Sequence, residues 1–169
     1  LAQHKLEEAI ESWQRALVLN PTYLSAHNSL CLAFKQLGQL DQAAACFQQM
    51  LLLYPHSADV PYNLGNVFKQ QGKLEEAIAC YQQALTLHPN FSEANHNLAN
   101  ILKMQGQLQE AVIYYQRALA DNPHNVQILS NLGGVFNGLN QFEEAATCFQ
   151  RALSVTPNNA GVYKDLGIV

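Results

Sequence analysis

The stretch at residues 58–91 reads ADVPYNLGNVFKQQGKLEEAIACYQQALTLHPNF, and it contains two helical patterns separated by Gly72. A shift of 34 residues in either direction finds the same residue types again. One proline per step shows the period most simply: Pro21, Pro55, Pro89, Pro123 and Pro157. A fixed period of this length indicates an array of stacked repeats. We predict four full units at 24–57, 58–91, 92–125 and 126–159, a second helix alone at 1–23 and a first helix alone at 160–169.

Each unit is expected to form two antiparallel helices that pack closely together. The eighth position of a unit is always small, and it holds Cys31, Gly65, Ala99, Gly133 and Gly167. A small residue there allows the partner helix to approach. The fifteenth position, at the end of the first helix, holds Gly38, Gly72, Gly106 and Asn140. Both residue types tolerate the left-handed conformation that ends a helix.

The segment Gly72-Lys73-Leu74-Glu75-Glu76-Ala77, followed by Tyr81, Ala84 and Pro89, resembles the second-helix motif of the tetratricopeptide repeat family. The motif recurs in five registers, so the resemblance covers the whole chain. It implies an all-α fold, a right-handed superhelical solenoid of antiparallel helix pairs whose concave inner face is built from first helices. The segments 63–66 and 97–100 (Asn-Leu-Gly-Asn and Asn-Leu-Ala-Asn) further resemble repeats of the O-linked N-acetylglucosamine transferase superhelix and its bacterial counterparts. In those repeats inner-face asparagines hold substrate peptides.

Two units depart from the common pattern. Pro61 stands at the fourth position of its unit, and proline is tolerated only in the first turn of a helix. We therefore expect that helix to start late, capped by Ser57 or Asp59. The first helix of residues 126–159 contains Gly133, Gly134 and Gly138. Glycine disfavours helix, so we expect this to be the softest first helix, with the fastest amide exchange.

Composition limits the classes of partner. Charged residues make up 13% of the chain and the net charge is −4, which is not the basic surface of a nucleic-acid-binding protein. No apolar run approaches the roughly 20 residues of a membrane span, so we predict neither nucleic-acid binding nor membrane insertion. Residue 1 already lies inside a repeat, so we expect a segment of a longer protein, located in the cytoplasm.

The four cysteines are expected to be free and apolar. Cys46, Cys80 and Cys148 occupy the same place in three units, and Cys31 occupies the small eighth position. Equivalent positions in adjacent units lie about 8–10 Å or more apart, which exceeds the reach of a disulfide. Free thiols are compatible with a reducing compartment.

No known catalytic motif is present, so we predict that the chain is not an enzyme and needs no cofactor. The six histidines lie beside turn prolines or stand apart from other ligand residues, so we predict no metal site. Paired glutamates recur at the start of second helices, where the helix dipole favours acidic side chains. We interpret them as structural.

The inner face of the first helices is the candidate binding surface. Periodicity places Asn63, Asn97 and Asn131 there as one row, and Asn66 and Asn100 as a second row. Tyr62, His96, Lys69 and Lys103 flank these rows. A carboxamide offers a donor and an acceptor together, so the asparagines would bind peptide backbone while the flanking side chains set preference. Alternatively, the amides bond neighbouring helices or water and bind nothing.

We therefore predict a non-catalytic protein-interaction scaffold whose groove binds an extended peptide or a partner helix. Chaperone adaptors of this family clamp a terminal carboxylate with cations around such asparagines. Here Asp59 and Glu93 stand at the second position of their units, so we expect no preference for an acidic C-terminal tail. Two alternatives are the substrate-recruiting arm of a larger glycosyltransferase and a self-assembling module. For the last, apolar residues at the two ends would be partly uncovered: Leu6, Ile10, Trp13, Val162, Tyr163, Leu166 and Ile168.

Overall fold

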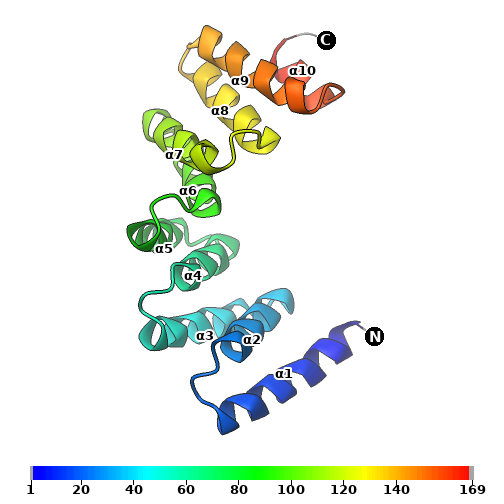
Figure 1. Cartoon of the computed structure of the whole chain (residues 1–169), viewed down its shortest axis with the longest axis vertical. Coiled ribbons are helices and arrows are strands. Elements are labelled where there is room, and N and C mark those ends of the chain that lie inside the picture. The colour runs from blue at the N-terminus through cyan, green and yellow to red at the C-terminus, as the bar shows by residue number, and fades with distance from the viewer. Residues whose placement is uncertain (1, 168–169) are drawn as a thin grey trace. The chain divides into compact units, whose positions relative to one another are not determined.

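The computed structural model describes residues 2–167, with the side chains of residues 4–167, and every regular element in this range is an α-helix. The chain divides into two compact units, residues 1–87 and 88–169. The first unit contains α1 (Ala2–Leu19), α2 (Leu24–Gln36), α3 (Leu40–Leu53), α4 (Asp59–Gln70) and α5 (Leu74–Leu87) (Figure 1). The second contains α6 (Ser92–Met104), α7 (Leu108–Asp121), α8 (Val126–Gly138), α9 (Phe142–Val155) and α10 (Ala160–Asp165).

Within each unit the helices pack in consecutive pairs. In the first unit α2 packs against α3 and α4 against α5, and α3 also contacts α4. In the second unit α6 packs against α7 and α8 against α9, and α7 also contacts α8. Each helix therefore buries its apolar face against its neighbours in sequence, as in a repeat array. The all-α fold of repeated helix pairs predicted from the sequence is confirmed.

The loops within the pairs use a left-handed residue to stop the first helix. Gly38, Gly72 and Gly106 have φ angles of 73°, 75° and 77°, and Asn140 has a φ of 60°. This conformation turns the next amide back onto the helix: the N–H of Gln39 donates to the carbonyl of Phe34 at 2.9 Å. Such a bond satisfies a carbonyl that the helix leaves open. The predicted helix ends are confirmed.

A close approach of the two helices is visible at the small eighth position. A methyl group built on Gly65 would lie 2.8 Å from the ring of Tyr81, and one built on Gly133 would lie 2.6 Å from the ring of Phe149. Both rings are buried. At Gly65 and Gly133, a side chain larger than hydrogen would therefore displace the buried ring of the pair. The eighth position of the other full units holds the small residues Cys31 and Ala99, which are fully buried.

The helix that contains Pro61 starts late, as predicted, but its predicted cap is wrong. Helix α4 begins at Asp59, one residue later in the repeat than α2 and α6. Pro61 consequently lies in the first turn, where its missing N–H has no intrahelical partner to lose. The cap residue is Ala58, and no side chain caps the helix. By contrast, Asn125 accepts a hydrogen bond from the Ile128 N–H and caps α8.

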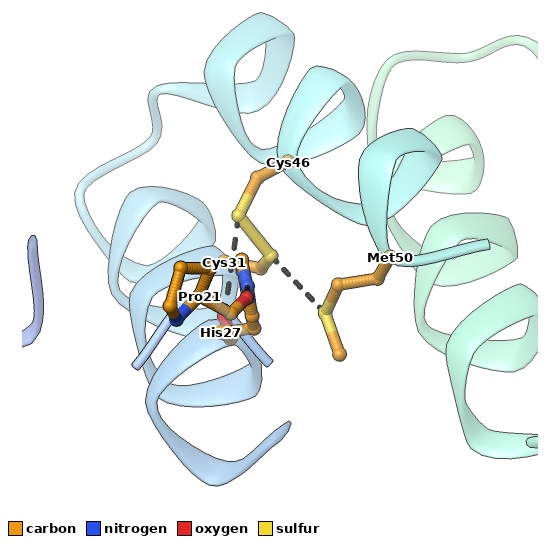
Figure 2. The surroundings of a disulfide bond; sticks show 5 residues. All are labelled: Pro21, His27, Cys31, Cys46 and Met50. Carbon is orange, nitrogen blue, oxygen red and sulfur yellow. Dashed lines mark hydrogen bonds between the residues drawn. A yellow bond between two sulfur atoms is a disulfide. The ribbon is translucent and has the colours of Figure 1, made fainter. Parts of the chain in front are cut away.

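The prediction of four free cysteines is wrong for one pair. Cys31 on α2 and Cys46 on α3 form a disulfide with their Cα atoms 5.4 Å apart (Figure 2). The sequence argument compared equivalent positions in different units, whereas these two residues face each other within one helix pair. Cys80 and Cys148 are free and buried. Disulfides are typical of oxidising compartments, whereas the sequence analysis predicted a cytoplasmic location. That location stays a prediction.

The disulfide is packed inside the first unit. The sulfur of Cys31 lies 3.5 Å from the sulfur of Met50, and the sulfur of Cys46 lies 4.0 Å from the carbonyl oxygen of His27 (Figure 2). A disulfide sulfur carries no proton, so both are packing contacts. The ring of His27 hydrogen-bonds the carbonyl of Pro21 through Nε2 at 2.8 Å, which ties the loop before α2 to the same region.

The apolar residues at the ends of the chain are covered to different degrees. Ile10 and Val162 are buried, whereas Tyr163 is 37% exposed. Leu6, Trp13 and Leu166 are half-buried. Ile168 lies outside the described residues. Self-association through these ends therefore stays a prediction.

Candidate functional site

A hollow of about 570 Å³ lies on the first unit between the beginnings of α2 and α4. Ten residues line it: Tyr23, Leu24, Ser25, Asn28, Met50, Ser57, Asp59, Val60, Tyr62 and Asn63. Its walls are largely apolar, with Met50 and Val60 buried at the base and Tyr23 half-exposed at the rim. A small number of polar groups among apolar walls is the usual composition of a ligand site.

The amides of Asn28 and Asn63 face this hollow and are half-buried. Within residues 4–167, neither side chain has a hydrogen-bond partner in the protein. Polar side chains that are partly removed from water normally find a partner. Each carboxamide can donate and accept at once, so the two together offer a ligand both kinds of hydrogen bond.

Asp59 carries the only carboxylate among the described residues that line the hollow. It lies in the first turn of α4 and is exposed. Lys69 lies in the last turn of the same helix, and Lys35 lies in the last turn of α2. Burial, and after it the neighbouring Lys35 ammonium, lower the pKa of Lys69. One end of this surface is therefore acidic and the other is basic.

Asn66 and Asn100 hold tyrosine hydroxyls of their own helix pairs. The Tyr81 hydroxyl donates to the side-chain oxygen Oδ1 of Asn66 at 2.8 Å, and the Tyr115 hydroxyl donates to Oδ1 of Asn100 at 2.5 Å. Both tyrosine rings are buried, and a buried phenol needs an acceptor. Burial raises the pKa of both tyrosines, and Tyr62 and Cys80 add to the shift at Tyr81.

The sequence contains a signal for these pairs that spacing alone does not reveal. The units with asparagine at the ninth position, Asn66 and Asn100, have tyrosine fifteen residues later. The other two full units have Leu32 or Gly134 there, followed by Phe47 or Phe149 at the same spacing. A ring without a hydroxyl needs no acceptor, so the two positions change together.

In the second unit, Asn131 joins a network of side chains. Its side-chain nitrogen Nδ2 lies 3.2 Å from His96 Nε2 and donates to the side-chain oxygen Oδ1 of Asn100, also at 3.2 Å. The Asn100 amide nitrogen is also 3.2 Å from His96 Nε2. Gln127 donates to the Asn131 carbonyl oxygen at 3.3 Å. An amide nitrogen can only donate, so Nε2 of His96 is the acceptor in both contacts.

The predicted site residues therefore fall into two groups. Tyr62 and Asn63 line the hollow of the first unit, and Lys69 lies on the same helix. Asn97, His96, Asn131 and Lys103 lie in the second unit, where Asn97 is half-buried on α6. Lys103 reaches α8, since its Nζ would be 3.8 Å from a methyl group on Gly134. Sequence reasoning missed Asn28, although its repeat position is the one that holds Tyr62 and His96.

No group of three or more histidine, cysteine, aspartate or glutamate side chains within residues 4–167 could hold a metal ion. None of the helices in the described part of the chain has the length and apolar character needed to cross a membrane. The one fully buried polar side chain in the described core is Asn95, whose amide donates to the carbonyls of Pro89 and Phe91 at 3.0 Å. That asparagine holds the loop before α6, which is a structural role.

Comparison with known families agrees with the repeat. A family model described as TPR repeat matches residues 1–38 and 65–106. Two models described as tetratricopeptide repeat match residues 90–158 and 32–57. The chain belongs to the tetratricopeptide repeat family. The narrower resemblance to the transferase superhelix stays a prediction, as does the absence of catalysis.

Solved structures with the same tetratricopeptide repeat fold include two of MamA and one of YrrB. One MamA structure has a TM-score of 0.82 and 20% identity, and the match covers 95% of this chain and 94% of that chain. The other has a TM-score of 0.80 and 20% identity, and the match covers 95% of this chain and 87% of that chain. YrrB, described as a TPR protein with an unusual peptide-binding site, has a TM-score of 0.77 and 21% identity. That match covers 95% of this chain and 83% of the YrrB chain. Identities this low show the fold alone. No curated protein sequence matches the chain.

Proposed function

We propose that this tetratricopeptide repeat chain is a protein-interaction scaffold that binds an extended peptide along α2 and α4. The observation that carries the proposal is the pair of half-buried amides, Asn28 and Asn63, which have no partner in the described chain and face one hollow. A peptide unit offers the matching carbonyl and N–H.

The side-chain preference of the site would come from the rest of the hollow. Tyr62 and Val60 provide apolar walls, and Asp59 provides a negative charge at the rim. A peptide side chain that enters the hollow buries apolar area against them, which stabilises the complex by about 25 cal/mol per Å² of apolar surface buried. The proposal is supported by the similar fold of YrrB, which is described as a TPR protein with an unusual peptide-binding site.

The second unit is proposed as a weaker contributor. Asn97, Asn131, His96 and Lys103 are accessible enough to contact a peptide, but Asn131 and Asn100 already bond each other and His96. A ligand would have to replace these bonds, which reduces the net gain. The transferase arm and the self-assembling module stay predictions, because no contact in the described residues favours either.

To test the proposal, a displayed library of random heptapeptides is selected for binding to the full chain. Affinity of the selected peptide is then measured by isothermal titration calorimetry for the wild-type chain and for Asn28→Ala, Asn63→Ala and the double variant. Each substitution removes one or two hydrogen bonds of about 0.5–1.5 kcal/mol each, so we expect a loss of affinity between about twofold and about 150-fold per site.

Asn158→Ala is the matched control, since Asn158 is an exposed asparagine in the loop after α9. It should leave the affinity unchanged. Circular dichroism should show the same helix content in all five chains. The binding surface would be rejected if no peptide is selected, or if neither asparagine substitution changes the affinity of the selected peptide.

A further inference from the structure

Helices α2 and α4 both begin at the hollow of the first unit. Residues from the first turns of both, such as Leu24 and Val60, line the same hollow. Lysines from the last turns of both, Lys35 and Lys69, are close enough to influence each other electrostatically. The surface proposed above therefore has two defined ends, an Asp59 end and a lysine end.

The helix dipole alone explains only part of this charge arrangement. An acidic residue in a first turn and a basic residue in a last turn are each favourable. The dipole does not require two half-buried lysines at the ends of two different helices to influence each other electrostatically. Within the described residues, the structure shows no ion pair between Lys35 and a carboxylate. An anionic group placed between Lys35 and Lys69 would relieve their repulsion.

The separation of the two ends sets the spacing of charges on a ligand. Asp59 and Lys69 are ten residues apart on one helix, which corresponds to about 15 Å at 1.5 Å per residue. An extended peptide rises about 3.3 Å per residue and presents every second side chain to the same face. Residues i and i+4 of such a peptide span about 13 Å on one face, and their long side chains cover the remainder.

We propose that the occupant of this surface is an extended peptide with a basic residue against Asp59, an acidic residue four positions away against Lys35 and Lys69, and an apolar residue between them. The apolar residue, at i+2, lies about 6.6 Å from the basic one. Asn63 and Tyr62 stand about one helical turn, or about 5.4 Å, beyond Asp59, so the apolar side chain meets the hollow. This inference rests on the proposed function and adds the class of peptide.

Blocked peptides of the form Lys-Thr-Leu-Thr-Glu, with threonine spacers that disfavour helix, provide the test. The reversed peptide Glu-Thr-Leu-Thr-Lys, the all-basic and all-acidic versions, and one with Lys and Glu five positions apart complete the set. Binding to the full chain is followed by fluorescence anisotropy at low and high salt. We expect one of the two i, i+4 orders to bind at least tenfold more tightly than the all-basic, all-acidic and i, i+5 peptides, with the advantage reduced by salt.

Charge-reversal variants separate this mechanism from general attraction. Asp59→Lys should shift the preference to the all-acidic peptide, and the Lys35→Glu, Lys69→Glu double variant should shift it to the all-basic peptide. Lys164→Glu, at an exposed lysine of α10, should leave the order of affinities unchanged. Circular dichroism on each variant checks that the helices form.

The outcomes distinguish the two proposals. If all the peptides bind equally and binding depends on Asn28 and Asn63, the peptide site stands and the charge pattern is rejected. If none of them binds while a library-selected peptide does, the charge pattern is likewise rejected. If no peptide binds from either source, the proposed function itself fails.

Discussion

Cys31 and Cys46 join α2 to α3 through a disulfide that lies against Met50, a residue at the base of the hollow on the first unit. The bridge closes a segment of 15 residues that contains the turn between the two helices. It therefore fixes one wall of the candidate site to the helix that supports it.

Reduction of this disulfide should destabilise the first unit. Closing a loop of this length restricts the unfolded chain and stabilises the fold by about 3 kcal/mol. We expect a reductant to lower the urea midpoint of the wild-type chain but not that of a Cys31→Ala, Cys46→Ala variant. Alkylation of the unfolded, unreduced chain should modify Cys80 and Cys148 only. Modification of all four cysteines would show that the bridge does not form.

Two adjacent glycines of α8 should respond to alanine in opposite directions. A methyl group on Gly134 would lie 3.8 Å from Lys103 Nζ, an ordinary contact, whereas one on Gly133 would lie 2.6 Å from the ring of Phe149. Gly134→Ala should therefore stabilise the chain by about 0.5–1 kcal/mol through helix propensity. Gly133→Ala should destabilise it by about 1–3 kcal/mol, since a buried ring must move.

Urea unfolding of the two variants measures this difference, and each serves as the control for the other. Changes of the same sign would mean that packing against Phe149 does not decide the effect. Amide exchange on the same samples tests whether α8 is the softest first helix, which stays a prediction.

Stability should fall at alkaline pH because of two buried tyrosines. Burial raises the pKa of Tyr81 and Tyr115 above their usual value of 10.0. Above about pH 10 the unfolded chain releases these protons while the folded chain keeps them, so deprotonation favours unfolding. Their stabilising contribution is complete below about pH 10 and is lost as the pH rises toward the folded pKa values.

The urea midpoint measured from about pH 8 to 11 tests this dependence. A Tyr81→Phe, Tyr115→Phe variant should lose about 1 kcal/mol per hydrogen bond at neutral pH and show a weaker decline above pH 10. Tyr163→Phe, at an exposed tyrosine, should decline like the wild type. An unchanged slope in the double variant would contradict the assignment.

The repeat, the helix ends and the packing positions follow from the sequence. Gly72 and Asn140 stop their helices because local backbone conformation favours them there. Gly65 and Gly133 are small because a ring of the same pair fills the space beside them. These features depend on spacing within one unit, so the 34-residue period predicts them for every unit at once.

Only the tertiary structure showed which asparagines have partners. Periodicity places Asn63 and Asn66 on the same face, but it does not show that Asn66 holds the Tyr81 hydroxyl while Asn63 has no partner in the described chain. It also does not show that Cys31 meets Cys46. Spacing determines the face of a helix on which a side chain lies. Hydrogen bonds and disulfides depend on distances of a few ångströms between different helices, and these are set when the helices pack.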